Sequence, residues 1–167
     1  ILVPHIKTRE EAEWVVYNAK YPPVGRRGVE NVMPDADLGF ADSLAYLEHA
    51  NRETFVAIQI EDVEALDNLD DIIGTPGVEF LFVGPADLGL SMGIPFDIEN
   101  PRMQEAIKKV ASAAAKAGKY WGLPVGNVAA AQRYYDLGAR YFNLGGDYGL
   151  LREGFTRLRR EFTGVFG

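Results

Sequence analysis

The most informative stretch of this sequence is FLFVGPADL, residues 80–88, an apolar run that stops at a glycine–proline pair and a single acid, Asp87. A second apolar run, residues 55–60, ends in another acid, Glu61, about one strand–helix–strand unit earlier in the chain. Because neighbouring parallel strands lie ~4.8 Å apart, acids just past the carboxyl ends of both strands can converge on one point. Two converging carboxylates either share a proton or bind a cation, so we expect a functional site here.

On both sides of this stretch, strand-like and helical patterns alternate without a break. Continuous apolar strands of this kind predict an α/β fold with one parallel sheet, either an open doubly wound sheet or part of a barrel. No Gly-x-Gly-x-x-Gly motif follows any strand, which disfavours dinucleotide binding. We expect strands at 1–6, 55–60, 78–83, 121–125 and 139–144, helices at 10–19, 41–50, 63–73, 101–117, 128–137 and 148–162, and irregular segments at 25–39 and 89–100.

Composition excludes several classes of function. The chain has 167 residues, 47% of them hydrophobic, which suits one domain with a real core. A net charge of −7 argues against nucleic acid and anionic membranes as partners, and no run approaches the ~18 apolar residues that span a bilayer. There is no cysteine, so disulfides, thiolate metal sites and cysteine nucleophiles are excluded. Ile1 already reads as the interior of a strand, so we expect the true N-terminus to lie upstream.

Several short motifs in a fixed order give the chain a family resemblance. They are LVPH at 2–5, YPPVGRRG at 21–28, QIE at 59–61, GPADL at 84–88 followed by SMG at 91–93, and the late turns at Gly126 and Asp147. Each is weak alone, but together they resemble the HpcH/HpaI aldolase/citrate lyase family of metal-dependent pyruvate aldolases. The resemblance covers essentially the whole chain.

The resemblance implies a (β/α)8 TIM barrel of the phosphoenolpyruvate/pyruvate superfamily. Residues 1–167 would be a single domain that corresponds to its C-terminal part, strands four to eight with their helices. In the family, the missing strands carry an acid/base histidine and a charge-neutralising arginine, so we expect both upstream of Ile1. His5 at the end of the first strand and His49 late in a helix are not expected to replace that histidine.

The same resemblance implies that Glu61 and Asp87 bind a divalent metal ion. Carboxylate oxygens suit Mg²⁺, Mn²⁺ or Co²⁺ better than zinc, and a 2-oxo acid can chelate such an ion, which stabilises the enolate formed when a C–C bond breaks. Gly84, Pro85 and Ala86 would bind the substrate carboxylate through backbone N–H groups, of which proline has none, and Gln59 would contact a ligand. The alternatives are helix-capping acids, a plain tight turn and a glutamine packed inside the barrel.

Other polar residues are weaker candidates for a functional site. Asn127 and Asp147 follow the last two strands, where barrels often bind phosphate, but an acid beside the glycines favours a cap or a rim contact. Arg26 and Arg27 fit carboxylate recognition, a subunit contact or a structural role. Lys7, among charged residues before a helix cap, is not expected to form a Schiff base.

The final helix is strongly apolar, with Phe155, Leu158 and Phe162 among its residues. This pattern predicts packing in the core, and an exposed stripe would instead suit docking onto another subunit.

The resemblance therefore implies a cytoplasmic, homo-oligomeric class II aldolase, a trimer or hexamer. It would cleave a 4-hydroxy-2-oxo acid to pyruvate and an aldehyde. One alternative is a lyase acting on a citrate- or malyl-type thioester, and another is a non-catalytic barrel fragment that folds only with its missing strands or with another chain.

Overall fold

The computed structural model describes residues 1–30 and 32–166 and confirms the predicted parallel sheet. Its five strands are hydrogen-bonded in chain order, and every neighbouring pair is parallel. The strands are β1 (Leu2–Val3), β2 (Val56–Ile60), β3 (Val78–Val83), β4 (Tyr120–Pro124) and β5 (Tyr141–Asn143). Consecutive parallel order with a helix at each crossover is the arrangement of a barrel wall rather than of a doubly wound sheet. Every strand therefore ends at the same edge.

The first strand is shorter than the expected 1–6. Leu2 pairs with Ala57 and Val3 with Ile58, but Pro4 has no N–H to continue the ladder. His5 then adopts a left-handed backbone with φ 57°, which turns the chain out of the strand. The expectation for residues 4–6 was wrong because strand pairing stops at this turn.

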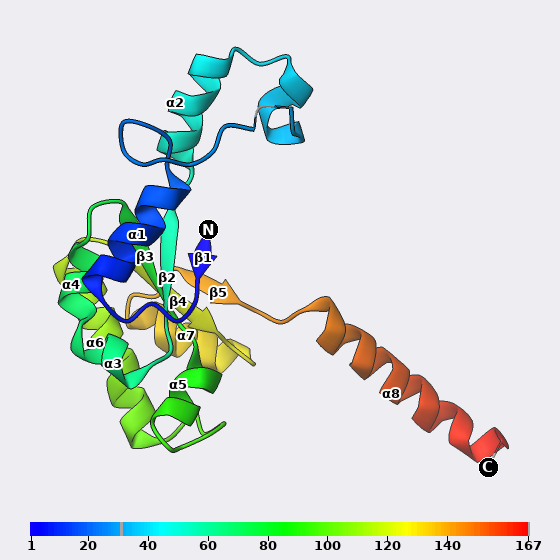
Figure 1. Cartoon of the computed structure of the whole chain (residues 1–167). Helices are drawn as coiled ribbons and strands as arrows, with labels where there is room; N and C mark the ends of the chain where they lie inside the picture. The colour runs from blue at the N-terminus through cyan, green and yellow to red at the C-terminus, as the bar shows by residue number, and fades with distance from the viewer. Residues whose placement is uncertain (31, 167) are drawn as a thin grey trace.

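Helices cover one face of the sheet (Figure 1). α1 (Arg9–Ala19) packs against β2, and α4 (Leu69–Gly74) and α6 (Pro101–Lys116) pack against β3. Val56, Ile58 and Ile60 of β2 are buried completely. α1 begins at Thr8, whose hydroxyl accepts the Glu11 N–H while the Glu11 carboxylate accepts the Thr8 N–H, a reciprocal cap that the sequence predicts.

Two helical segments differ from the expectation. The helix expected at 63–73 is divided into α3 (Val63–Asp67) and α4 at Asn68, whose side-chain amide donates to the Lys7 carbonyl at 2.8 Å. The irregular segment expected to start at Gly89 starts only after Ser91, because α5 (Pro85–Ser91) continues past Gly89. Its last residue, Ser91, accepts the Val63 N–H at 3.0 Å and so ties the ends of α5 and α3 together.

The opposite face of the sheet carries few helices and many exposed aromatic rings. Phe55, Tyr120 and Tyr141 are 52%, 62% and 52% exposed. Phe55 and Tyr141 contact the Phe80 ring, whose centroid lies 6.4 Å from that of Phe55 and, edge to face, 5.7 Å from that of Tyr141. Grooves of about 200 Å³ and 380 Å³ run along this face. In a closed barrel this face would be the filled interior.

A small second core lies beyond the amino ends of the strands, at the top of Figure 1. There the 3₁₀ segment η1 (Pro34–Gly39) packs on α2 (Ser43–Glu53). Tyr21, Ala36, Tyr46 and Ala50 are buried together in it, so part of the segment expected to be irregular at 25–39 is structured. Asn31 lies outside the described residues.

The last helix, α8 (Asp147–Phe166), projects away from the sheet (Figure 1). It follows α7 (Val128–Asp136) and β5, and its described side chains are exposed, Phe155 at 68% and Leu158 at 46% among them. The expectation that this apolar stripe packs in the core of the same chain was wrong, because the helix extends beyond the reach of the sheet.

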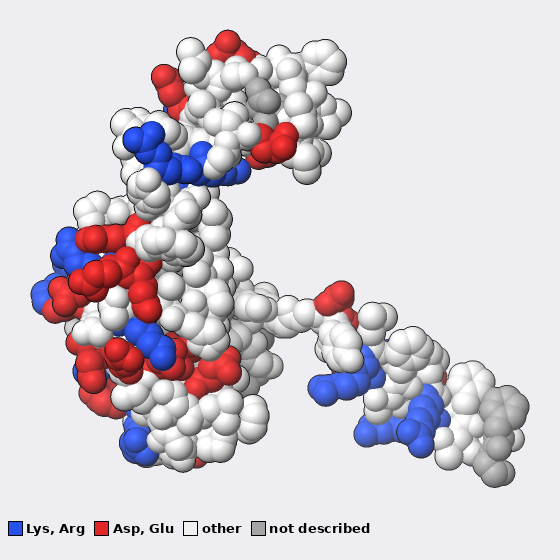
Figure 2. Space-filling model, viewed as in Figure 1, with Lys and Arg blue, Asp and Glu red and all other residues white. Residues whose placement is uncertain are grey.

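Acidic side chains gather over the helices that cover the sheet, whereas several arginines lie on α8 (Figure 2). The acids in the first turns of α1 and α4, Glu10, Glu11, Asp70 and Asp71, contribute to the helical face. Among the described residues, no helix combines the length and apolar character that crossing a lipid bilayer requires.

Candidate functional site

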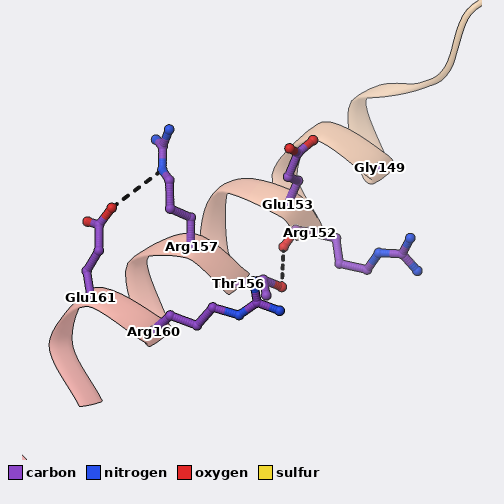
Figure 3. A pocket seen from close by; sticks show the side chains of 7 residues that line it. All are labelled: Gly149, Arg152, Glu153, Thr156, Arg157, Arg160 and Glu161. Carbon is purple, nitrogen blue, oxygen red and sulfur yellow. Dashed lines mark hydrogen bonds and ion pairs between the residues drawn. The ribbon is translucent and has the colours of Figure 1, made fainter. Parts of the chain in front are cut away.

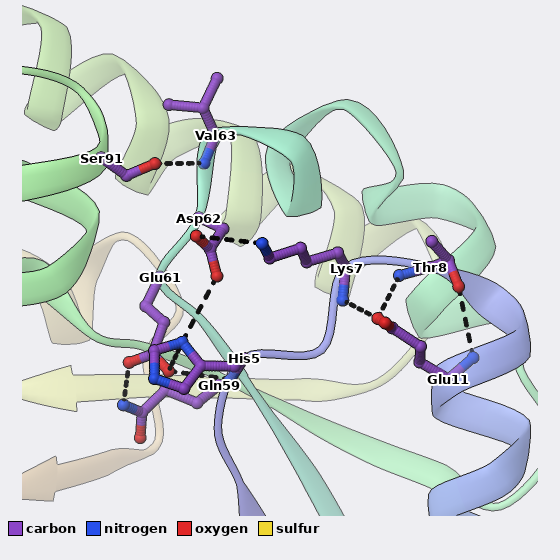
Figure 4. A network of polar contacts seen from close by, with 9 residues as sticks. All are labelled: His5, Lys7, Thr8, Glu11, Gln59, Glu61, Asp62, Val63 and Ser91. Carbon is purple, nitrogen blue, oxygen red and sulfur yellow. Dashed lines mark hydrogen bonds and ion pairs between the residues drawn. The ribbon is translucent and has the colours of Figure 1, made fainter.

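Glu61 follows the last residue of β2 and is a buried carboxylate with donors around it (Figure 4). Its side chain is 1% exposed. The Oε1 atom accepts the backbone N–H of His5 at 2.9 Å and lies 3.2 Å from the imidazole Nδ1 of the same residue. The Oε2 atom accepts a short hydrogen bond from Nε2 of Gln59. Burying an ionised carboxylate is costly unless it is hydrogen-bonded, and these donors meet that cost.

Gly84 lies directly against this carboxylate. A Cβ atom at Gly84 would be 2.8 Å from Glu61 Oε2 and 3.0 Å from Gln59 Nε2, closer than non-bonded atoms approach. The Gly84 N–H donates to the Ile60 carbonyl at 3.0 Å. Because residue 84 has no side chain, the start of α5 can lie against the end of β2 and against the Glu61 carboxylate.

Asp87 is in the first turn of α5 and is exposed to solvent. Gly84 is the N-cap of this helix and Pro85 its first residue, so the GPA segment is a tight turn that leads directly into a helix. Among the described residues no side chain caps this turn, which leaves the Ala86 N–H directed beyond the helix end. The negative charge of Asp87 is favourable at this helix start.

His5, Asp62 and Lys7 also lie at the site, although sequence reasoning did not place them there. His5 Nδ1 lies 3.5 Å from Asp62 Oδ2, an atom that is buried without a hydrogen bond. Lys7 Nζ lies 3.7 Å from Asp62 Oδ1. The only sequence signal was position, since Asp62 follows Glu61 and His5 follows a strand. Lys7 is 37% exposed, which agrees with rejecting it as a Schiff-base lysine.

The remaining candidates serve local structure. Asn127 caps α7 by accepting the Ala130 N–H at 2.9 Å, and Asp147 accepts the N–H of Tyr148 at 2.8 Å at the start of α8. The Arg27 guanidinium lies over the Tyr21 ring, 4.7 Å from its centroid. Arg26 is exposed. These contacts agree with the capping and structural alternatives rather than with a phosphate site.

A hollow of about 610 Å³ lies elsewhere and is no enclosed site. All of its lining residues belong to α8 and include Arg152, Arg157 and Arg160 (Figure 3). A single exposed helix cannot surround a small molecule. The buried carboxylate at the carboxyl edge of the sheet is the better candidate.

Glu61 fits a hard divalent cation as one ligand. Its Oε2 atom accepts from one donor, Gln59, and lies against Gly84, so it retains capacity for a further contact. The described residues include no group of three or more histidine, cysteine, aspartate or glutamate side chains that could hold a metal. An ion bound by two carboxylates and completed by water is the usual arrangement for Mg²⁺, so such a small set is compatible with the chemistry.

Comparison with known proteins identifies relatives for most of the chain. Residues 1–154 match the family described as HpcH/HpaI aldolase/citrate lyase. The 4-hydroxy-2-oxo-heptane-1,7-dioate aldolase of Shigella sonnei (strain Ss046) is 37% identical over 139 residues, 83% of this chain and 53% of that protein. The 5-keto-4-deoxy-D-glucarate aldolase of Shigella boydii serotype 18 (strain CDC 3083-94 / BS512) is 37% identical over 138 residues, with the same coverage. The chain thus spans about half the length of these curated relatives.

Solved structures agree with the sequence match. A crystal structure of a HpcH/HpaI aldolase/citrate lyase family protein from Burkholderia cenocepacia J2315 superposes with a TM-score of 0.85 at 33% identity. The match covers 97% of this chain and 64% of that one. The five-stranded sheet and its helices therefore correspond to a contiguous part of a larger, known fold.

Proposed function

Since this chain belongs to the HpcH/HpaI aldolase/citrate lyase family, we propose that it is the metal-binding part of a divalent-metal-dependent aldolase. Membership confirms the resemblance and the barrel-type α/β fold expected from the sequence. The proposed reaction cleaves a 4-hydroxy-2-oxo acid to pyruvate and an aldehyde. The observation that carries the proposal is the buried Glu61 carboxylate, whose Oε2 faces Gly84 at the start of the helix that contains Asp87.

In this proposal Glu61 and Asp87 hold Mg²⁺, Mn²⁺ or Co²⁺. When bound, such an ion supplies a Lewis acid that polarises the keto oxygen of the substrate. The uncapped Ala86 N–H and the shape that Pro85 gives the turn would orient the substrate carboxylate. Gln59 fixes Glu61 through its amide nitrogen and keeps its amide oxygen for a ligand.

We propose further that three strand–helix units complete the barrel and carry the acid/base histidine and the arginine, before Ile1. Support comes from the exposed aromatic face of the sheet, with Phe55 and Tyr141, and from the third of the Burkholderia chain that the match leaves uncovered. A homo-oligomer, a trimer or hexamer, is proposed because α8 presents an exposed apolar stripe, and large exposed patches mark interfaces.

The metal assignment is tested by following deuterium exchange at the methyl group of pyruvate while Mn²⁺ or Mg²⁺ is titrated. In a protein that also contains the preceding strands, the parent is compared with Glu61→Gln, Asp87→Asn and the control Glu64→Gln, an exposed carboxylate of α3. We expect metal-dependent exchange to fall at least about a hundredfold in the first two variants, because each loses a charged ligand, and to persist in the control. Unchanged metal dependence in both site variants would contradict the assignment.

Two further measurements test the alternatives, a thioester lyase and a non-catalytic fragment. A thioester lyase requires that coenzyme A derivatives compete with pyruvate for binding, and no competition discards it. If this chain is inert while a longer chain with the preceding strands is active, the non-catalytic fragment describes this polypeptide by itself.

A further inference from the structure

His5 combines an unusual backbone with an unusual set of contacts. Its φ of 57° lies in the left-handed region, which non-glycine residues rarely occupy and which clusters at functional sites. This conformation directs the backbone N–H and the imidazole of one residue toward the same atom, Oε1 of Glu61, at 2.9 Å and 3.2 Å (Figure 4). A residue in extended conformation would continue β1 and lose at least one of these contacts.

The contacts make the two oxygens of Glu61 different. Oε1 accepts the backbone N–H of His5 at 2.9 Å and also has the imidazole Nδ1 3.2 Å away, so two nitrogens of His5 lie against it. Oε2 has one donor, Gln59, and lies against Gly84; because a carboxylate oxygen accepts about two hydrogen bonds, it retains acceptor capacity. The oxygen with remaining capacity is thus the one that faces α5.

The imidazole itself is held from a second side. Asp62 Oδ2 lies 3.5 Å from the same Nδ1 atom, and Lys7 Nζ lies 3.7 Å from Asp62 Oδ1. The His5 side chain is otherwise 68% exposed, so hydrophobic burial does not fix its position. Its orientation comes from the two carboxylates.

We propose that His5 is a positioning residue for Glu61: it occupies Oε1 so that the carboxylate presents Oε2 alone to the divalent ion. This inference rests on the proposed function, since the role has meaning only if Glu61 is a metal ligand. Groups that orient a metal ligand commonly contribute ten- to a hundredfold to metal affinity. His5 does not contact the reacting atoms in this scheme.

The variants are chosen so that residue 5 can keep its left-handed backbone conformation. His5→Gly keeps that conformation and the N–H and removes only the imidazole. His5→Asn also tolerates it and retains a side-chain donor. The control is His49→Ala, which removes the chain's other histidine from α2, where its Nδ1 lies 3.0 Å from Arg52. Thermal unfolding of each variant verifies that it is folded.

Mn²⁺ affinity is measured on the whole chain by the electron paramagnetic resonance of free Mn²⁺. We expect His5→Gly to weaken binding roughly tenfold, His5→Asn to restore most of it, and His49→Ala to bind as the parent does. Equal affinity of parent and His5→Gly overturns the inference while the proposed function stands. No binding by the parent overturns the proposed function and the inference together.

A metal-free measurement tests the contact directly. In nitrogen NMR of the imidazoles, Glu61→Gln should shift the Nδ1 resonance of His5 and leave that of His49 in place. An unmoved His5 resonance also overturns the inference, because the imidazole then does not hold the carboxylate.

Discussion

Gly84 is the residue on which the site depends most directly. Gly84→Ala would place a Cβ 2.8 Å from Glu61 Oε2 and 3.0 Å from Gln59 Nε2, and these two groups are bonded to each other while the His5 N–H holds the carboxylate. We expect Mn²⁺ affinity to fall at least about tenfold, because the displaced carboxylate loses its orientation. Calorimetric titration with Mn²⁺ measures the loss.

Gly74→Ala provides the matched control for that substitution. Gly74 is the last residue of α4, and a Cβ there would meet nothing within 4 Å. Replacing it should leave metal binding unchanged and stability equal or slightly higher. If both alanine variants bind Mn²⁺ as the parent does, the close approach at Gly84 has no bearing on the ion.

Among the elements, α1 offers a clean test of a sequence-encoded cap. Thr8→Ala removes the hydroxyl that accepts the Glu11 N–H at 3.3 Å and should lower the free energy of unfolding by about 1 kcal/mol. Thr156→Ala in the exposed α8, where the hydroxyl bonds only the Arg152 carbonyl at 2.7 Å, should cost almost nothing. Urea denaturation measures the free energy of unfolding of both variants. Equal losses would mean that the Thr8 cap does not stabilise α1.

The contact between η1 and α2 should be visible as a pH dependence. The Tyr46 hydroxyl donates to Asp35 at 2.8 Å, and this bond, followed by the influence of the neighbouring Tyr21 hydroxyl, raises the pKa of Tyr46 from 10.0 to about 12. A raised pKa means that the neutral phenol stabilises the fold. Its contribution is complete below pH 10 and is lost as pH rises through about 12.

Phenolate absorbance during an alkaline titration reports this step. We expect the latest tyrosine transition of the parent to be absent in Tyr46→Phe and present in Tyr148→Phe, whose ring lies on the exposed α8. A late transition that survives in Tyr46→Phe would mean that another tyrosine titrates last.

At the scale of the whole molecule, α8 and the open sheet face expose many apolar side chains, Phe155 and Tyr141 among them. If α8 docks on another subunit, Phe155→Glu should shift the sedimentation profile toward the monomer, since burying such a ring contributes about 2 kcal/mol per site. Thr156→Glu adds the same charge on the adjacent face and should leave the profile unchanged. A monomeric parent would contradict the proposed oligomer.

The sequence by itself determined the local chemistry of this protein. Strand burial, helix capping and proline geometry act over a few neighbouring positions, so a short stretch of sequence indicates them. Examples are the apolar runs ending at Glu61 and Asp87, the caps Thr8 and Asn127, and Pro101 at the start of α6. These signals predicted the parallel sheet and most of the helices, whereas the family was indicated by the resemblance of several motifs in a fixed order.

Only the tertiary structure decided which groups surround the carboxylate. His5 lies 56 positions from Glu61 in the chain, and no local pattern indicates that its left-handed backbone would direct the N–H and the imidazole toward one oxygen. The projection of α8 was equally hidden, since an apolar stripe looks the same whether it meets its own core or another surface. Contacts between distant segments depend on how the whole sheet and its crossovers close, and that closure is a property of the fold rather than of any short stretch.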